Sequence, residues 1–157
     1  MTLADLSWLA LAAYAVHIME EYQFNWRDWA RAVVGLPVEW NDFYVTNAVV
    51  VVLGIVQAQL AARMPVVSLA FAALMLINAT FFHVMPFLRT GGRFSPGLLT
   101  AVALFYPLGV AMFLAAAREG TLSLGVAAGA GVAGAVLMAL PVAFLQWRGL
   151  PYFRQDR

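Results

Sequence analysis

Four long runs without any formal charge constrain this chain more than any other feature. Each holds at least 20 residues, and the only histidine in them is His83. The runs are Phe43 to Ala62, Met64 to Leu88, Phe94 to Ala117 and Gly120 to Trp147. About 20 apolar residues in a helix cross ~30 Å of hydrocarbon, so each run predicts a transmembrane helix. A fifth, shorter run from Leu6 to Met19 can span only if Glu20 and Glu21 reach the edge of the hydrocarbon. The sequence therefore predicts an all-α, polytopic membrane bundle of five transmembrane helices in a single domain, over residues 3–21, 43–62, 65–88, 96–117 and 121–147.

Composition excludes most other classes of protein. The chain is 64% hydrophobic and only 11% charged, which leaves too little polar surface for a soluble or disordered protein. It has no cysteine, which excludes a disulfide-stapled fold and thiol redox chemistry. Its formal net charge of +1 argues against a nucleic-acid partner, and all nine basic residues are arginines, so no lysine can form a Schiff base.

The arginines predict how the bundle is oriented. With five spans, Arg63 and Arg118 fall on the side of the N-terminus, and the other side carries Arg27, Arg31, Arg89, Arg93, Arg148, Arg154 and Arg157. Arginine is enriched in cytoplasmic loops. We expect a protein of the cytoplasmic (inner) membrane with its N-terminus outside and its C-terminus in the cytoplasm.

The connection from Tyr22 to Asp42 predicts an amphipathic segment on the membrane surface. Within it, Asn25 is expected to cap a short helix that ends at Gly35. One face of that helix would carry Trp26, Trp29, Ala30 and Val33. Two interpretations stay open, an aromatic belt that anchors the protein in the interface and a lid over a site on the cytoplasmic face.

Small residues in the last run predict close helix packing. Gly125, Gly129 and Ala133 recur every four residues, as do Ala130 and Gly134, and this spacing lets a second backbone approach. A homodimer through Gly125 and Gly129 is one way to use it. Pro107 and Pro141 predict local kinks in the last two helices.

The ionisable groups inside the hydrophobic runs are the strongest functional signal. His17 precedes Glu20 and Glu21 by three and four residues, so the three side chains share one helix face with Tyr14. His83 lies late in the third span, which runs parallel to the first, so both histidines are expected in the cytoplasmic half. Buried charge is costly unless it is paired, neutralised or bound to a metal, and intramembrane ionisable residues are usually functional.

Imidazole together with carboxylate is a donor set for zinc or iron. The sequence predicts one divalent metal bound by His17, Glu20, Glu21 and His83, since a di-iron site would need two Glu-x-x-His units that the chain lacks. The same four residues are the candidate catalytic groups. The alternative is structural: the glutamates would reach the interface, His17 would bond to Tyr14 or a backbone carbonyl, and His83 would pair with Asn78.

These residues resemble the HXXEE family of small bacterial membrane proteins. The resemblance rests on His17-Ile-Met-Glu-Glu21, on the later Asn78 and His83, and on Ser95-Pro96-Gly97 at the start of the fourth span. It implies that His17, Glu20, Glu21, Asn78, His83 and, less directly, Asn47 matter, but it implies no activity. Glu39, Asp42 and Tyr106 are added only because they are predicted on the same side of the membrane as these residues. The expected substrate contacts are Tyr14, Asn47, Asn78 and Tyr106.

The start of the fourth span suggests an anion site. Ser95 can cap that helix and Pro96 fits its first turn, beside Arg89 and Arg93. A phosphate or carboxylate head held there, with its tail between the helices, would describe a phospholipid, an isoprenoid phosphate or a fatty-acid derivative. The alternative is that both arginines serve orientation alone.

Three functions follow as expectations. The first is an integral membrane enzyme, a metal-dependent hydrolase or oxidoreductase acting on a hydrophobic small molecule such as a membrane lipid, with a metal-free acid/base isomerase or cyclase as its variant. The second is a proton-coupled carrier, which also uses intramembrane Glu and His. The third is an accessory or sensor subunit in which the polar cluster only fixes helix register.

Overall fold

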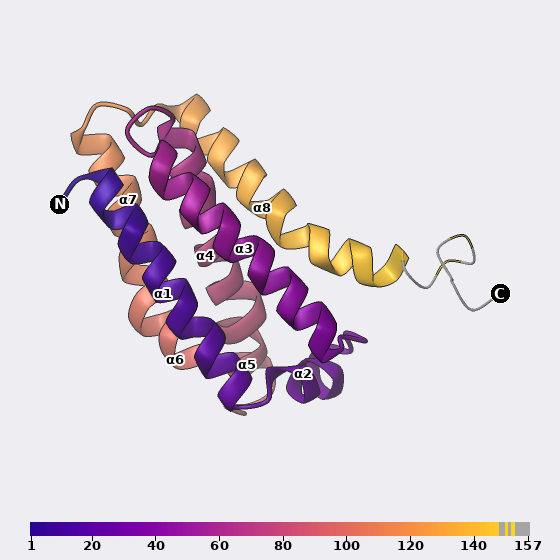
Figure 1. Ribbon diagram of the computed structural model, residues 1–157. Coiled ribbons are helices and arrows are strands. Elements are labelled where there is room, and N and C mark those ends of the chain that lie inside the picture. Colours follow the sequence, from indigo (N-terminus) through magenta and orange to yellow (C-terminus); the bar gives the residue numbers. More distant parts are fainter. Residues whose placement is uncertain (148–149, 151, 153–157) are drawn as a thin grey trace.

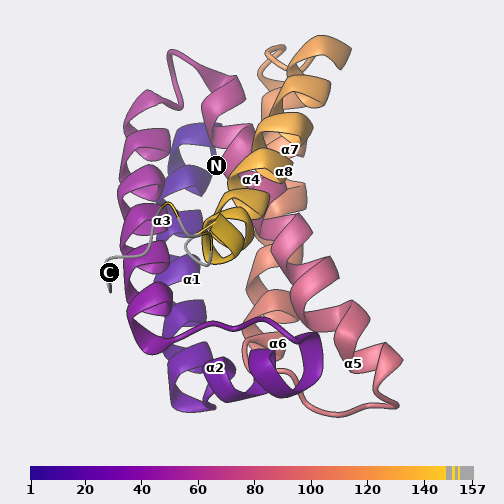
Figure 2. The same cartoon turned by 90° about the vertical axis from the view of Figure 1, so that its right-hand side faces the viewer.

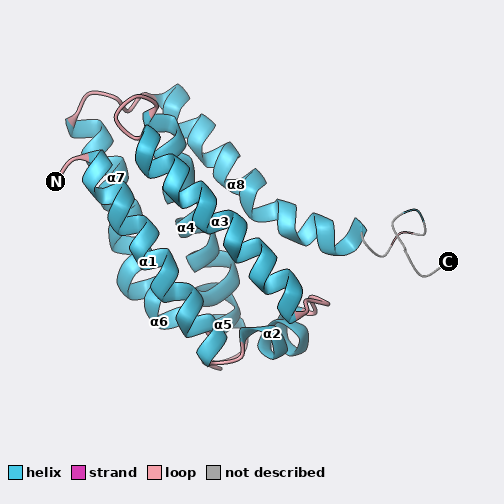
Figure 3. Ribbon diagram, in the orientation of Figure 1, coloured by secondary structure: helices cyan, strands magenta, loops and turns pink. Residues whose placement is uncertain are grey.

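The described residues of the computed structural model, 1–147, 150 and 152, form helices and short connections without a strand (Figure 3). Five helical stretches in them are long and apolar enough to cross a membrane. They are α1 (Leu3–Gln23), α3 (Trp40–Leu60), the continuous stretch of α4 (Pro65–Asn78), η2 (Ala79–Val84) and α5 (Met85–Arg89), the stretch of α6 (Leu98–Thr100), η3 (Ala101–Phe105) and α7 (Tyr106–Arg118), and α8 (Leu124–Trp147). The five predicted spans are thus confirmed as helices, with boundaries shifted by a few residues.

α4 lies at the centre of the bundle and packs against α1, α3, α7 and α8 (Figures 1 and 2). Its residues from Ser68 to Met75 are buried without a break, as expected of a helix that has neighbours on every side. α1 packs against both α3 and α7. By contrast, α8 contacts the bundle mainly along α4, and its second half bends away from the other helices (Figure 1).

One end of the bundle gathers segments that are far apart in the sequence. The C-terminal end of α1, the short helix α2 (Trp26–Trp29), α5 and the start of α6 all lie at the lower end in Figure 1. The connections 61–64 and 119–123 lie at the opposite end. The two histidine-bearing segments therefore end on the same side, as the parallel arrangement of the first and third spans predicts.

Two of the spans contain a π-helical turn just before a proline. η2 precedes Pro86 and η3 precedes Pro107. A proline lacks the N–H that would bond to the carbonyl four residues earlier, so the preceding turn can widen. Where a kink is predicted at Pro107, the structure has this π-helical turn, and α8, which contains Pro141, stays continuous and bends (Figure 1).

The segment after α1 forms α2 and η1 (Ala30–Val34) and ends at Gly35, which has a left-handed backbone, as predicted. Its apolar face is confirmed, because Trp29 and Ala30 are buried and Trp26 and Val33 pack beside them. The expected cap is wrong: Asn25 is itself left-handed, and its side chain donates to Asp28 instead of accepting from a backbone N–H of the helix.

Arginines tie this segment to the start of α3. Arg27 and Arg31 both donate to the carboxylate of Glu39, which precedes α3. These bonds from the two guanidinium groups lower the pKa of Glu39 below its usual range. Arg27, Arg31, Arg89 and Arg93 lie at the end of the bundle where both histidines are, whereas Arg148, Arg154 and Arg157 lie outside the described residues.

The small residues of α8 pack inside the chain. Gly134 and Ala130 are buried, and a Cβ built on Gly134 would stand 2.8 Å from the Ala73 side chain and 2.9 Å from the Ala70 carbonyl of α4. A Cβ built on Gly125 or Gly129 would have its nearest contact at 3.9 Å, which is ordinary van der Waals distance. The close approach predicted for this helix is therefore made by Gly134 to α4, and the homodimer through Gly125 and Gly129 stays a prediction.

We expect Gly134→Ala to lower the free energy of unfolding by about 1–3 kcal/mol, because the added methyl overpacks the α4–α8 contact. The matched control is Gly131→Ala in the same helix, where a Cβ meets nothing within 4 Å. That change should be neutral or stabilising by about 0.5–1 kcal/mol, as is usual for glycine to alanine in a helix. Thermal unfolding of the purified protein measures both, and equal stability of the two variants would contradict the packing argument.

Candidate functional site

The two histidines of the chain meet in the interior. His17 comes from α1 and His83 from the π-helical turn η2, and both are fully buried. Their ring centroids lie 4.8 Å apart with the rings nearly perpendicular. The prediction that two distant segments bring their imidazoles together is confirmed.

Glu21 joins the pair from the last turn of α1. Its Oε1 lies 3.5 Å from Nε2 of His17 and 3.6 Å from Nε2 of His83. The residue is 5% exposed. One ligand atom from each of the three residues falls within 4.8 Å of the others, so this group is able to hold a metal ion.

A threonine fixes the tautomer of His17. Nδ1 of His17 lies 2.8 Å from Oγ1 of Thr100, and this hydroxyl donates to the carboxylate of Glu20 at 2.6 Å. A hydroxyl has one proton to donate, so Thr100 must accept a hydrogen bond from Nδ1–H of His17. In the neutral imidazole, Nε2 then carries a lone pair directed to Glu21.

A serine does the same for His83. Nδ1 of His83 lies 3.1 Å from Oγ of Ser95, whose hydroxyl donates to the backbone carbonyl of Phe82 at 3.4 Å. When this hydroxyl donates to the carbonyl of Phe82, Ser95 accepts from Nδ1–H of His83, and Nε2 of His83 then also presents a lone pair. Neither Nε2 atom has a hydrogen-bond partner in the described part of the chain.

Three acceptor atoms thus face one another in a buried space. Two imidazole lone pairs and a carboxylate oxygen repel unless a positive charge lies between them, either a metal ion or a proton. A metal-binding histidine usually donates its other ring N–H to an acceptor that fixes the ring and its tautomer, and the hydroxyl oxygens of Thr100 and Ser95 are placed to accept in this way.

Glu20 has a different place from the one expected of a ligand. Its Oε1 accepts from the backbone N–H groups of Gly97 and Leu99, and its Oε2 accepts from the N–H and the hydroxyl of Thr100. The carboxylate caps the helix that begins at α6, where free N–H groups and the helix dipole attract negative charge. The sequence-based expectation that Ser95 caps this helix is therefore wrong, because Ser95 bonds to His83 and a side chain from α1 takes the cap. The expectation of Glu20 as a fourth ligand is likewise not supported by its position.

The carboxylate of Glu20 occupies the helix N-terminus at which an anionic ligand was expected. Arg89 and Arg93 are exposed, and neither forms an ion pair in the described residues. The helix N-terminus beside them already holds the negative charge of Glu20. The structure does not bring the two arginines into a common pocket with the histidines.

Gly97 lies against both rings. A Cβ built there would stand 2.5 Å from Cε1 of His83, 2.7 Å from Cε1 of His17 and 3.1 Å from Cγ of Glu21. Its φ of +94° also favours glycine. The Ser95-Pro96-Gly97 motif thus supplies a hydrogen bond to one histidine and the space that both rings occupy.

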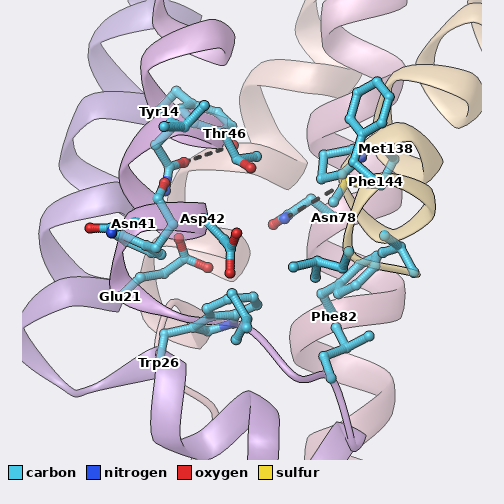
Figure 4. A pocket seen from close by; sticks show the side chains of 18 residues that line it. Tyr14, Glu21, Trp26, Asn41, Asp42, Thr46, Asn78, Phe82, Met138 and Phe144 are labelled. Atoms are coloured by element: carbon cyan, nitrogen blue, oxygen red, sulfur yellow. Dashed lines mark hydrogen bonds between the residues drawn. The ribbon is translucent and has the colours of Figure 1, made fainter. Parts of the chain in front are cut away.

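A cavity of about 380 Å³ opens beside Glu21, between α1, α3, the third span and α8 (Figure 4). In Figure 4, Glu21 and Asp42 point toward its centre from one side and Asn78 from the other. Its volume is within the range of ligand pockets, ~300–1,000 Å³. Its walls are largely apolar, with contributions from Trp26, Leu36, Val38, Phe43, Val45, Phe82, Met138, Pro141, Val142, Phe144 and Leu145.

Three of the expected substrate contacts line this cavity. Asn78 is buried and its Oδ1 has no partner in the described residues, while Tyr14 donates to Oδ1 of Asn47 at 3.4 Å. Tyr106 lies elsewhere, with its hydroxyl 2.9 Å from Oγ1 of Thr80. Asp42 also reaches the cavity, although its carboxylate accepts from the backbone N–H of Glu39 at the start of α3.

Thr100 is the residue that sequence reasoning missed. It lies on the fourth span, three residues after Gly97, and it connects Glu20 to His17. A hydroxyl one turn after the Ser95-Pro96-Gly97 motif was the available signal. Its partners become visible only when α1 and α6 are placed side by side.

The fold and the site define a class: an all-helical chain with five helices able to span a membrane and a buried pair of histidines with a glutamate at one end. Comparison with known families matches residues 8–112 to the model described as "Protein of unknown function with HXXEE motif". The chain therefore belongs to the HXXEE family. No curated protein and no solved structure matches it significantly.

We expect Gly97→Ala to disrupt the site, because the methyl displaces both rings. Gly92→Ala is the matched control, since Gly92 has a φ of +95° and a Cβ there meets only Phe87 at 3.8 Å. Both changes carry the cost of a left-handed alanine, about 1 kcal/mol, and Gly97→Ala should cost about 1–3 kcal/mol more. Thermal unfolding of the two variants measures the difference, and equal melting temperatures would show that the contact with the rings is unimportant.

Proposed function

We propose that this protein is an integral membrane enzyme that uses one divalent metal ion, zinc or iron, to act on a hydrophobic substrate. The observation that supports it most directly is the convergence of Nε2 of His17, Nε2 of His83 and Oε1 of Glu21, all buried and all presenting lone pairs. We place the five long helices across the cytoplasmic membrane, because a chain with this much exposed apolar surface on its helices requires lipid around it.

The three donors fit a metal by spacing and by chemistry. Metal bonds of about 2.0–2.2 Å to nitrogen and oxygen hold neighbouring donors of a tetrahedron about 3.3–3.6 Å apart. The separations from Oε1 of Glu21 to the two Nε2 atoms, 3.5 and 3.6 Å, agree with that spacing, whereas the group as a whole spans up to 4.8 Å and would have to contract around a metal. Two histidines with one carboxylate are found in catalytic zinc sites and in non-haem iron sites, which keep a coordination position open for water or substrate.

The residues of the chain have distinct tasks in this proposal. A bound metal would supply Lewis-acid activation of water or of a substrate oxygen, or oxygen chemistry if it is iron. His17, His83 and Glu21 would hold it, and Thr100 and Ser95 orient the rings through Nδ1. Glu20 keeps α6 against α1, and since both of its oxygens already accept hydrogen bonds, we do not assign it proton transfer.

The cavity favours an apolar substrate. Glu21 is one of the three candidate metal ligands and also lines the cavity, so a molecule bound in the cavity would lie next to the metal site. The surrounding walls are dominated by aliphatic and aromatic side chains, which bind hydrocarbon rather than a strongly hydrated molecule.

We expect about one zinc or iron ion per chain in the purified protein, measured by elemental analysis after dialysis. Glu21→Gln and His83→Ala should each lower the bound metal at least 10-fold, because each removes a donor atom. Glu20→Gln is the matched comparison: it alters the adjacent carboxylate, which is not one of the three donors, should destabilise the fold by about 1–3 kcal/mol through the weakened cap, and should lower the bound metal much less than Glu21→Gln does.

Two outcomes would contradict the metal proposal. Metal-free protein that does not take up zinc or iron would leave a proton between Glu21 and the histidines, as in an acid/base enzyme or a proton-coupled carrier. Equal loss of metal in Glu20→Gln and Glu21→Gln at matched stability would show that the two glutamates do not have separate tasks.

The proposed orientation places the site in the cytoplasmic half and the N-terminus outside. The native chain has no cysteine, so single substitutions report position directly. With intact cells and a membrane-impermeant maleimide, Ser123→Cys should be labelled and Thr90→Cys should be protected until the membrane is opened. The reverse pattern would overturn the orientation inferred from the arginines.

A further inference from the structure

The polar groups around the cavity beside Glu21 indicate which head group its ligand carries. The polar residues of the wall are acids, amides and hydroxyls: Tyr14, Glu21, Asn41, Asp42, Thr46, Asn47 and Asn78. No arginine or histidine lines it among the described residues. A carboxylate or phosphodiester head has no hydrogen-bond donor to offer to the acceptor oxygens of these residues.

Asn78 is an independent indication of a ligand. The residue is only 6% exposed, and its side chain points into the cavity (Figure 4). Its Nδ2 has only a distant contact with the Met138 sulfur at 4.0 Å, and its Oδ1 has no partner in the described residues. A buried acceptor without a donor costs about 1–3 kcal/mol, so a donor supplied by a ligand would stabilise it.

The two carboxylates do not make the cavity a site for a cation. The carboxylate of Asp42 accepts from the backbone at the start of α3, where the helix dipole stabilises its negative charge. Glu21 faces the two histidines. If Glu21 holds a divalent ion as proposed above, an ammonium head beside it would be repelled.

We propose that the cavity binds a lipid-like molecule with an uncharged, hydrogen-bond-donating head, an aliphatic alcohol in its simplest form. The hydroxyl donates to Oδ1 of Asn78 with its oxygen on the Glu21 side, and the hydrocarbon lies along Phe82 and the second half of α8. This inference rests on the proposed function for the exclusion of amines. It replaces the anionic lipid head that the sequence suggested, because the arginines expected to bind that head are outside the cavity.

The test compares three ligands of equal chain length, dodecanol, dodecanoate and dodecylamine, added to protein reconstituted in nanodiscs. Binding is followed by tryptophan fluorescence, with Trp26→Phe to identify the signal from the cavity wall. Dodecanol should bind at least 10-fold more tightly than the acid and the amine. Asn78→Leu should weaken dodecanol about 5- to 10-fold, and Arg89→Gln, which alters a residue outside the cavity, should change nothing.

Tighter binding of dodecanoate or dodecylamine, or unchanged dodecanol binding in Asn78→Leu, would overturn this inference. Metal content measured on the same samples separates its failure from that of the proposed function. If the protein binds metal but does not prefer the alcohol, only the assignment of the head group is wrong. If the protein takes up no metal but still prefers the alcohol, the proposal of a metal enzyme is wrong and the proposal of an uncharged head group in the cavity stands.

Discussion

The carboxylate of Glu20 on the N-terminus of α6 is the interaction on which the site depends. It joins the end of α1 to the start of the fourth span through three backbone N–H groups and the hydroxyl of Thr100. Because that hydroxyl donates to Glu20, it must accept from His17, and this determines which nitrogen of the ring faces inward. The same contact keeps Ser95 and Gly97 beside His83. The carboxylate of Glu20 thus fixes the tautomer of His17 through Thr100, and it also fixes the position of the residues beside His83.

Two neighbouring glutamates in the sequence consequently have opposite surroundings. Glu20 accepts four hydrogen bonds and its negative charge is stabilised by a helix dipole, whereas Glu21 faces the Nε2 atoms of two histidines without a hydrogen bond to either. Consecutive residues of a helix point about 100° apart, so one side chain reaches α6 and the other reaches the space between the spans. The same chemical group serves as a structural cap at one position and as a candidate ligand at the next.

Much of the fold follows from the sequence because hydrocarbon imposes a length on every helix that crosses it. The five spans, the convergence of His17 with His83 and the ending of the surface segment at Gly35 were all predictable from run length, helical periodicity and glycine. The pairing of side chains between spans was not. The cap by Glu20, the role of Thr100 and the position of Arg89 and Arg93 outside the cavity depend on which helix lies beside which, and charge patterns along one chain do not contain that information.

The wide turn η2 makes the direction of His83 depend on a single residue. A π-helical turn corresponds to one extra residue inserted into an α-helix, and that insertion changes the direction in which every later side chain points. A chain shortened by one residue between Ala79 and Phe82 would restore a regular helix and rotate position 83 by about 100° relative to the residues before it. Its imidazole would then face a neighbouring helix or lipid instead of His17. Members of the family that lack this insertion would therefore need a different residue at the inward position to build an equivalent centre.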